Sequence, residues 1–204
     1  GAMTDLSMSG ARGTGIRQQR AAETRQKLIA AAQQLWLQLP FDDTHVTDIC
    51  AVAGVSVGSF YSHFPRKEDL LLELAAMAGD RTGAEADELL AGGGSTTEVM
   101  RTLVASMARR ATRGPRPLFA RAISELFRTM SRFDAVLRDR PGRADTLERV
   151  VIRGQERGEV HPAWRPREVA GALVMVSLHA QQQWGEGLDE PLEDLIWRRV
   201  RIVL

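Results

Sequence analysis

Apolar residues recur at helical spacing along most of this 204-residue chain, and no other feature constrains its fold as strongly. One clear example follows the i, i+4, i+7, i+8, i+11 spacing of a single buried helix face: Leu28, Ala32, Leu35, Trp36 and Leu39. Strand signals are nearly absent, because β-branched runs are few and Asn-Gly and Asp-Gly hairpin turns are missing. The pattern predicts an all-α protein.

Prolines and glycines divide this helical pattern into segments. Pro40 ends the first helix, Gly114-Pro115 and Pro141-Gly142 separate later ones, and residues 92–95 (GGGS) form a flexible linker. With 44% apolar residues, the chain can bury a core in one large domain or two small ones. No apolar run approaches the roughly 18–20 residues of a membrane-spanning helix, so we expect no membrane partner.

The net charge of +1 conceals a blocky distribution, with 27 Lys and Arg against 26 Asp and Glu. Between Gly10 and Lys27 five basic residues face one acid, whereas between Glu68 and Met100 eight acids face one base. The fifteen arginines of Arg101–Arg165 are typical of solvated helix faces. Near-neutrality is therefore a cancellation and does not argue against a nucleic-acid partner.

The single cysteine, Cys50, cannot form an internal disulfide, which fits a reducing cytoplasm. We expect it to act as a small buried hydrophobe, with redox sensing as the alternative. The N-terminus lacks the apolar core of a secretory signal, and Gly1-Ala2-Met3 is typical of a cloning remnant. We expect a cytoplasmic protein.

Residues 44–64 differ from the rest of the chain because they contain two short helical stretches separated by a tight turn. Val46, Ile49 and Ala53 can form the inner face of a two-turn helix, which Gly54 can end through a positive φ. Ser56 is a good N-cap for a second short helix. Two short helices joined by a turn that contains Gly indicate a helix–turn–helix, whose second helix enters the major groove of DNA.

The second helix and its flanks carry residues suited to DNA. Its outward residues are small, so its backbone can approach base edges, and Tyr61, His63 and Lys67 can reach phosphate oxygens. No acid lies between Asp48 and Glu68. The predicted DNA-binding residues are Thr44, His45, Thr47, Ser56, Val57, Gly58, Ser59, Tyr61, Ser62, His63 and Lys67. A purely structural turn between two helices is the alternative.

These residues resemble the DNA-binding domain of the TetR (tetracycline-repressor) family. The resemblance rests on Thr24-Arg25, Leu28-Ile29-Ala30-Ala31-Ala32, Val46-Thr47-Asp48-Ile49 and the run AGVSVGSFYSHFPRKEDL at 53–70. It implies a three-helix helix–turn–helix domain at 20–80 and a larger helical effector-binding and dimerisation domain at 81–204, after a cloning remnant and flexible basic arm at 1–19. It further implies a homodimeric, ligand-responsive repressor in which Tyr61 and Lys67 grip phosphates and residues 57–59 lie against bases.

Three positions depart from the family pattern. His45 stands where a Ser or Thr often caps the helix, so Thr44 or His45 must serve there. Cys50 replaces the usual Ala. Val57 replaces a frequent Lys or Arg, and we expect the basic arm Arg12–Arg20 to restore the missing charge, through the minor groove as other N-terminal arms do.

The second half of the chain offers an effector pocket and a dimer interface. Apolar and methionine-rich walls suit an adaptable pocket, and the candidates are Met100, Met107, Phe119, Ile123, Phe127, Met130, Trp164, Met175, His179 and Trp184. The resemblance implies that the last two helices pair across a two-fold axis, with candidates Val169, Ala172, Leu173, Val176, Ala180, Leu195 and Ile196. Ordinary core packing is the alternative for both sets.

Catalytic signatures are missing: there is no Gly-x-Ser-x-Gly elbow, no phosphate-binding loop and no His-Glu-x-x-His. The four histidines and Cys50 lack metal-ligand spacing, so we expect no enzyme activity, no metal and no cofactor. The expected partners are an operator in double-stranded DNA, a small and mostly apolar effector, and a second copy of the chain. A transcriptional activator on the same DNA-binding unit and a protein-interaction module remain the rival hypotheses.

Overall fold

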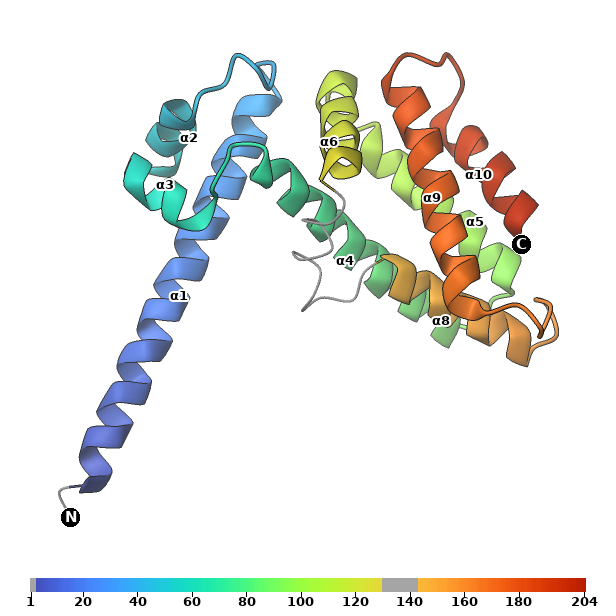
Figure 1. Ribbon diagram of the computed structural model, residues 1–204, viewed down its shortest axis with the longest axis horizontal. Coiled ribbons are helices and arrows are strands. Elements are labelled where there is room, and N and C mark those ends of the chain that lie inside the picture. Colours follow the sequence, from blue (N-terminus) through green and yellow to red (C-terminus); the bar gives the residue numbers. More distant parts are fainter. Residues whose placement is uncertain (1–2, 130–142) are drawn as a thin grey trace. The chain divides into compact units, whose positions relative to one another are not determined.

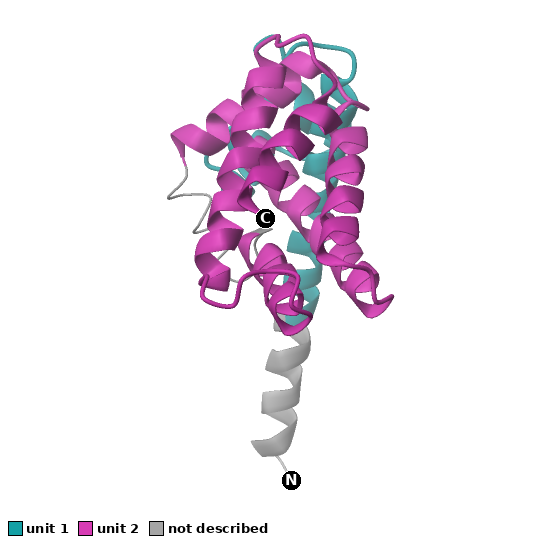
Figure 2. Ribbon diagram, turned by 90° about the vertical axis from the view of Figure 1, so that its right-hand side faces the viewer, with its two compact units in different colours: residues 1–70 teal, residues 71–204 magenta. Residues whose placement is uncertain are grey.

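The computed structural model describes the backbone of residues 3–129 and 143–204, and the side chains of residues 15–129 and 144–204. Nine helices and no strands occupy these residues, so the predicted all-α class is confirmed (Figure 1). The chain divides into two compact units, residues 1–70 and 71–204 (Figure 2). The predicted boundary at residue 80 lies inside the second unit, because Leu72 and Ala86 of α4 (Asp69–Ala91) pack into cores of that unit.

The first unit consists of α1 (Met3–Trp36), α2 (Val46–Ala53) and α3 (Val57–His63). Its three helices bury a shared apolar core that includes Leu28, Trp36, Ile49 and Phe60, each at most 1% exposed. Leu39, predicted on the inner face of the first helix, is 43% exposed because α1 ends at Trp36. The core of this unit therefore holds α2 and α3 against the C-terminal part of α1.

The N-terminal segment differs from the prediction. Residues 3–19, expected as a flexible arm, form the first part of α1. No proline precedes Pro40, and residues 17–23 (RQQRAAE) are good helix formers that extend the helix. The side chains of residues 15–23 are all exposed, so this stretch of α1 packs against no core.

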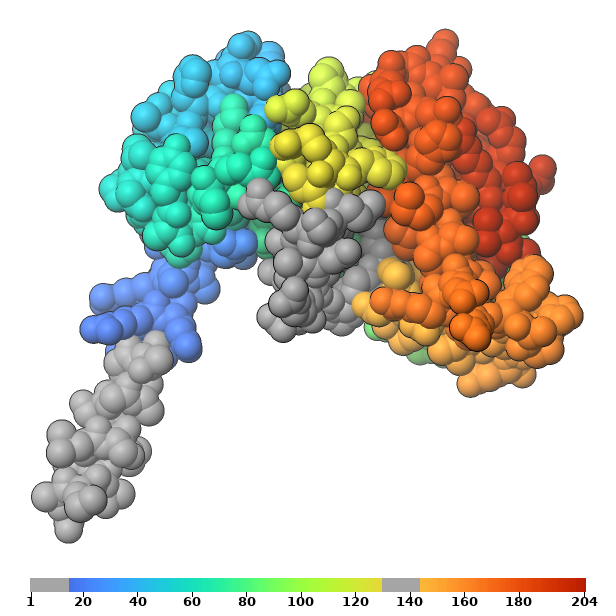
Figure 3. Space-filling model, viewed as in Figure 1, coloured from blue at the N-terminus to red at the C-terminus, as the bar shows by residue number. Residues whose placement is uncertain are grey.

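The second unit contains most of α4 and five further helices. These are α5 (Thr96–Ala111), α6 (Arg116–Arg128), α8 (Arg143–Glu156), α9 (Pro166–Gly185) and α10 (Leu192–Val203). Helix α9 packs against α6, α8 and α10, and it forms one side of the unit together with α10 (Figure 3). The main core includes Val104, Val150, Leu173 and Leu195, and a smaller cluster joins Leu72 to helices α6 and α9.

Candidate DNA-binding surface and effector cavity

The turn between α2 and α3 has the geometry that the sequence predicts. Gly54 adopts φ 68° and ψ 37°, in the left-handed region, and ends α2. The N–H of Val55 then bonds to the carbonyl of Cys50, and Ser56 Oγ accepts the N–H of Ser59 at 3.1 Å. An alanine at position 54 would be strained by its Cβ, so this glycine sets the angle between the two helices.

The N-terminus of α2 resolves the choice of cap in favour of His45. His45 holds the N-cap position, and its backbone N–H donates to Asp48 Oδ2 at 2.8 Å. Thr44 is fully buried, and its hydroxyl donates to the carbonyl of Pro40 at 3.0 Å. The prediction of Thr44 as a DNA-contacting side chain is therefore wrong, because burial leaves no surface for a phosphate or a base.

Most of the other predicted DNA-binding residues reach the surface of the first unit. Seven are exposed: His45, Thr47, Ser56, Val57, Gly58, Tyr61 and Ser62. Ser59, His63 and Lys67 are half-buried. An open groove of about 500 Å³ runs along this surface, and its lining includes Thr47, Val57, Tyr61 and Lys67. The groove brings the start of α2 together with the outer face of α3.

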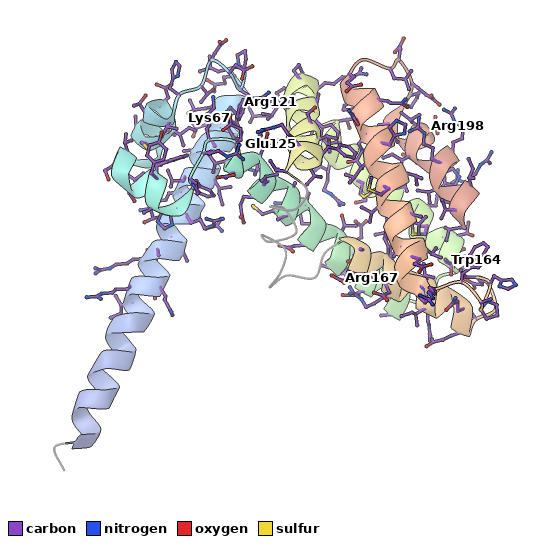
Figure 4. All side chains as sticks on the ribbon, in the orientation of Figure 1. Lys67, Arg121, Glu125, Trp164, Arg167 and Arg198 are labelled. Carbon is purple, nitrogen blue, oxygen red and sulfur yellow. The ribbon has the colours of Figure 1, made fainter. Side chains whose placement is uncertain are left out.

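Lys67 has a structural role that sequence reasoning missed. Its Nζ donates to the carbonyl oxygens of Phe41 and Thr44, both at 2.7 Å, and lies 4.1 Å from the centroid of the Phe41 ring (Figure 4). Two of its three N–H donors therefore hold the loop that leads into α2. The only sequence signal was an aromatic residue beside Pro40.

Arg25 holds the other end of the motif. Its Nη1 donates to the carbonyl of His63 at 3.1 Å, and its guanidinium carbon lies 4.2 Å from the centroid of the Phe64 ring. A cation at the C-terminus of α3 satisfies a carbonyl that the helix leaves unpaired. Arg25, one of the basic residues of α1, thus helps to fix the position of α3.

Cys50 lies in the core of the same motif. It is 3% exposed, and its Sγ donates to the carbonyl of Ser56 at 3.8 Å. Burial raises the pKa of the Cys50 thiol. Because the thiolate is the reactive form, this environment supports the structural interpretation over redox sensing.

The second unit contains a small, mainly apolar cavity of about 20 Å³. It is lined by Thr82, Met100, Leu103, Val104, Met107, Leu147, Val174 and Ser177. Met100 and Met107 are the two predicted pocket residues among these. Such a volume holds about one water molecule, so this cavity as it stands is too small for an effector.

The remaining pocket candidates lie elsewhere. Ile123 and Phe127 belong to the smaller core cluster, and Phe119 packs edge-on against Trp184 with centroids 5.5 Å apart. The predictions of Trp164, Met175 and His179 as pocket residues are wrong for this structure, since all three are exposed. Trp164, on the loop between α8 and α9, is 45% exposed (Figure 4) and Met175 is 48% exposed. Met130 lies outside the described residues.

Burial also revises the predicted dimer interface. Leu173, Ala180, Leu195 and Ile196 are fully buried within the chain itself, and Val169 is 8% exposed. These five predictions are wrong, because their side chains face the core of their own unit. Ala172 is exposed and Val176 is half-buried.

Neither a candidate metal-binding group nor a candidate membrane-spanning helix is found among the described residues. Across residues 15–129 and 144–204 no three His, Cys, Asp or Glu side chains are grouped so that they could hold a metal ion. None of the helices in the described part of the chain combines the length and the apolar character needed to cross a bilayer.

The chain is similar to known transcriptional regulators. The family model for bacterial regulatory proteins of the tetR family matches residues 28–74. The HTH-type transcriptional repressor BepR of Brucella suis is 36% identical over 58 residues, which is 28% of each protein. The HTH-type transcriptional regulator TcmR of Streptomyces glaucescens is 24% identical over 196 residues, 94% of this chain and 86% of TcmR.

A solved structure extends the likeness to both units. The TetR-family repressor FadR of Thermus thermophilus, in complex with lauroyl-CoA, matches with a TM-score of 0.77 at 23% identity, over 88% of this chain and 92% of that one. The helix–turn–helix and these matches indicate a DNA-binding transcriptional regulator. The chain is therefore similar to the TetR family of bacterial regulatory proteins, and the family model matches it at residues 28–74.

Proposed function

We propose that this protein is a homodimeric repressor that leaves a near-palindromic operator when a small, mostly apolar effector binds. The exposed outer face of α3 carries the proposal, because it is presented by a helix–turn–helix in a stretch without acids from Ile49 to Lys67. Two copies of α3 would lie about 34 Å apart, one turn of DNA, on successive major grooves. Such a regulator works in the cytoplasm, on the nucleoid when bound to DNA.

A duplex library of random sequence tests the DNA-binding part. We expect selection on the full chain to enrich a near-palindrome whose half-sites are one helical turn apart. Failure to enrich any sequence at any salt concentration would favour the interaction-module hypothesis instead. The sign of regulation is then decided by a reporter that carries the selected site: deletion of the gene should raise expression for a repressor and lower it for an activator.

The dimer part of the proposal is supported by apolar side chains left exposed on α9 and α10. Ala172 and Met175 of α9 are exposed, the latter by 48%, and Ile202 of α10 is 79% exposed. A two-fold axis beside such a surface would bury it against its own copy. We expect the double change Met175→Glu and Ile202→Glu to give a monomer in sedimentation experiments.

The matched control for the dimer experiment is Ile152→Glu. Ile152 is 41% exposed on α8 and is not part of the α9–α10 surface. It should leave the sedimentation coefficient unchanged. A dimer that survives the double change would contradict the proposed interface.

The effector part is supported by the cavity beside Met100 and Met107, and by the FadR complex, whose ligand carries an acyl chain. Because the cavity is small, the effector must bind a state in which it is enlarged, and flexible methionine side chains favour such adjustment. The effector releases DNA only if it binds the DNA-incompetent state more tightly; a coupling free energy of about 1–3 kcal/mol is typical.

A further inference from the structure

The outer face of α3 lacks the side chains that proteins usually use to distinguish guanine or adenine. Residues 57–63 (VGSFYSH) contain no Arg, Lys, Asn or Gln, the groups that form bidentate contacts to those bases. The next two cations are engaged within the protein: Arg66 pairs with Asp69 at 3.1 Å, and Lys67 donates to two backbone carbonyls.

The serine hydroxyls of α3 offer only weak discrimination. Ser56 Oγ accepts the N–H of Ser59, and the hydroxyl of Ser62 donates to the carbonyl of Ser59 at 2.7 Å. A hydroxyl can donate or accept, so it contacts several bases about equally well. The specificity of this helix must therefore depend largely on another kind of contact.

Val57 and Gly58 are the first two residues of α3, and both are exposed. Val57 is an apolar side chain that is 39% exposed at the first position of α3. Gly58 has no conformational need to be glycine, unlike Gly54, because its φ is not positive. A Cβ on Gly58 would meet no heavy atom closer than Ser56 Oγ at 4.0 Å. Position 58 thus carries no side chain, although an alanine there would fit and would favour the helix.

We propose that Val57 contacts the C5-methyl group of a thymine in each half-site, and that Gly58 allows α3 to approach closely enough for this contact. Thymine is the one base that presents a methyl group in the major groove. This inference rests on the proposed function and specifies one base of its operator. Apolar contact explains why the first residue of α3 is valine, which makes no hydrogen bond with its side chain.

Replacement of thymine by deoxyuridine tests this directly, because it removes only the methyl group. Each thymine of the selected duplex is replaced symmetrically in both half-sites, and the dissociation constant is measured by fluorescence anisotropy at one salt concentration. At one position we expect about a fourfold loss of affinity per half-site, and so about fifteenfold for both. In the Val57→Ala variant the same replacement should have little effect.

Val52→Ala is the matched control, since Val52 is a valine of α2 that is 45% exposed. It should respond to deoxyuridine as the unchanged protein does. Gly58→Ala should weaken binding on the order of tenfold without lowering the thermal midpoint. The inference is overturned if Val57→Ala remains as sensitive to that thymine, or if Gly58→Ala binds with unchanged affinity. If no duplex is selected at all, the proposed function fails, and this inference with it.

Discussion

Lys67 Nζ lies 2.7 Å from the carbonyl oxygen of Phe41 and 4.1 Å from the centroid of the same residue's ring. One ammonium group thus binds both the backbone and the aromatic face of a residue in the loop that precedes α2. Since the same group also holds the carbonyl of Thr44, the last residue before the N-cap, it fixes where α2 begins. Removal of Lys67 should therefore disturb the DNA-binding surface before any DNA is present.

We predict that Lys67→Met lowers the free energy of unfolding by about 1–2 kcal/mol, because two carbonyl oxygens lose a charged donor. Chemical denaturation of the full chain measures this. Lys27, the only other lysine, is exposed on α1, so Lys27→Met is a control that should be nearly neutral. Equal stability of the Lys67→Met variant and the unchanged protein would show that the three interactions of this ammonium group contribute nothing.

Tyr61→Phe should weaken operator binding without changing stability. Tyr61 is 53% exposed, and its ring packs edge-on against Phe60 with centroids 5.3 Å apart, a contact that phenylalanine preserves. Removal of one hydroxyl that bonds to a phosphate should reduce affinity about fivefold per half-site. The slope of log K against log salt should stay the same, because no charge is removed. Unchanged affinity would place the hydroxyl away from DNA.

The exposed N-terminal part of α1 should contribute to DNA affinity through its charge. Arg17 and Arg20 project from a stretch with no buried residue, so both are available to phosphates. The double change Arg17→Gln and Arg20→Gln, or a chain that starts at Ala21, should flatten the salt slope by about 0.9 for each phosphate that is no longer neutralised. Arg113→Gln, an exposed arginine of the second unit, is the control. An unchanged slope would refute a role for this segment.

The start of α5 should lose stability in acid. Glu159 Oε2 accepts the backbone N–H of Thr96 at 2.6 Å, and this hydrogen bond lowers the pKa of Glu159. A lowered folded-state pKa means that the stabilisation is present above the ordinary carboxyl range and is lost as the pH falls below about 4. Glu159→Gln should therefore lower the thermal midpoint more at pH 7 than in acid.

For this acid test the control is Glu156→Gln, which changes an exposed carboxylate at the last residue of α8, three residues before Glu159. It should leave the pH dependence of the thermal midpoint as it is. A difference between Glu159→Gln and the unchanged protein that is the same at both pH values would contradict the assignment.

Enlarging the cavity of the second unit should cost stability and create a binding site. Leu103 lines the cavity and is 1% exposed, so Leu103→Ala should destabilise the protein by about 3 kcal/mol. An enlarged apolar cavity binds small apolar molecules, and benzene should raise the thermal midpoint of the variant but not of the unchanged protein. No response of the variant to benzene would mean that the site collapses.

The DNA-binding motif was predictable because its signals are local. Gly54 ends α2 through its own backbone freedom, and Ser56 caps α3 through a side chain three residues from its partner, so neighbouring residues suffice to specify both. Spacing alone could not separate Thr44 from Thr47. Thr44 precedes α2 and is fully buried, whereas Thr47 lies in the first turn of α2 and is exposed.

The pocket and interface residues depended on contacts between distant segments. Leu173 and Met175 both lie on α9 and both have apolar side chains, but α9 packs against three other helices, which bury one and leave the other 48% exposed. A helical repeat specifies which residues share a face, but it does not specify whether that face meets its own core, a ligand or a second chain.

The sequence by itself determined the all-α class, the helix–turn–helix and the resemblance to the TetR family, since all three depend on spacing and on backbone preferences of nearby residues. Only the tertiary structure decided the roles of Lys67 and Arg25, which hold loop and helix termini through partners 26 and 38 residues away. A charged side chain is drawn to whichever carbonyl groups folding leaves unpaired nearby, and that neighbourhood exists only after the helices have packed.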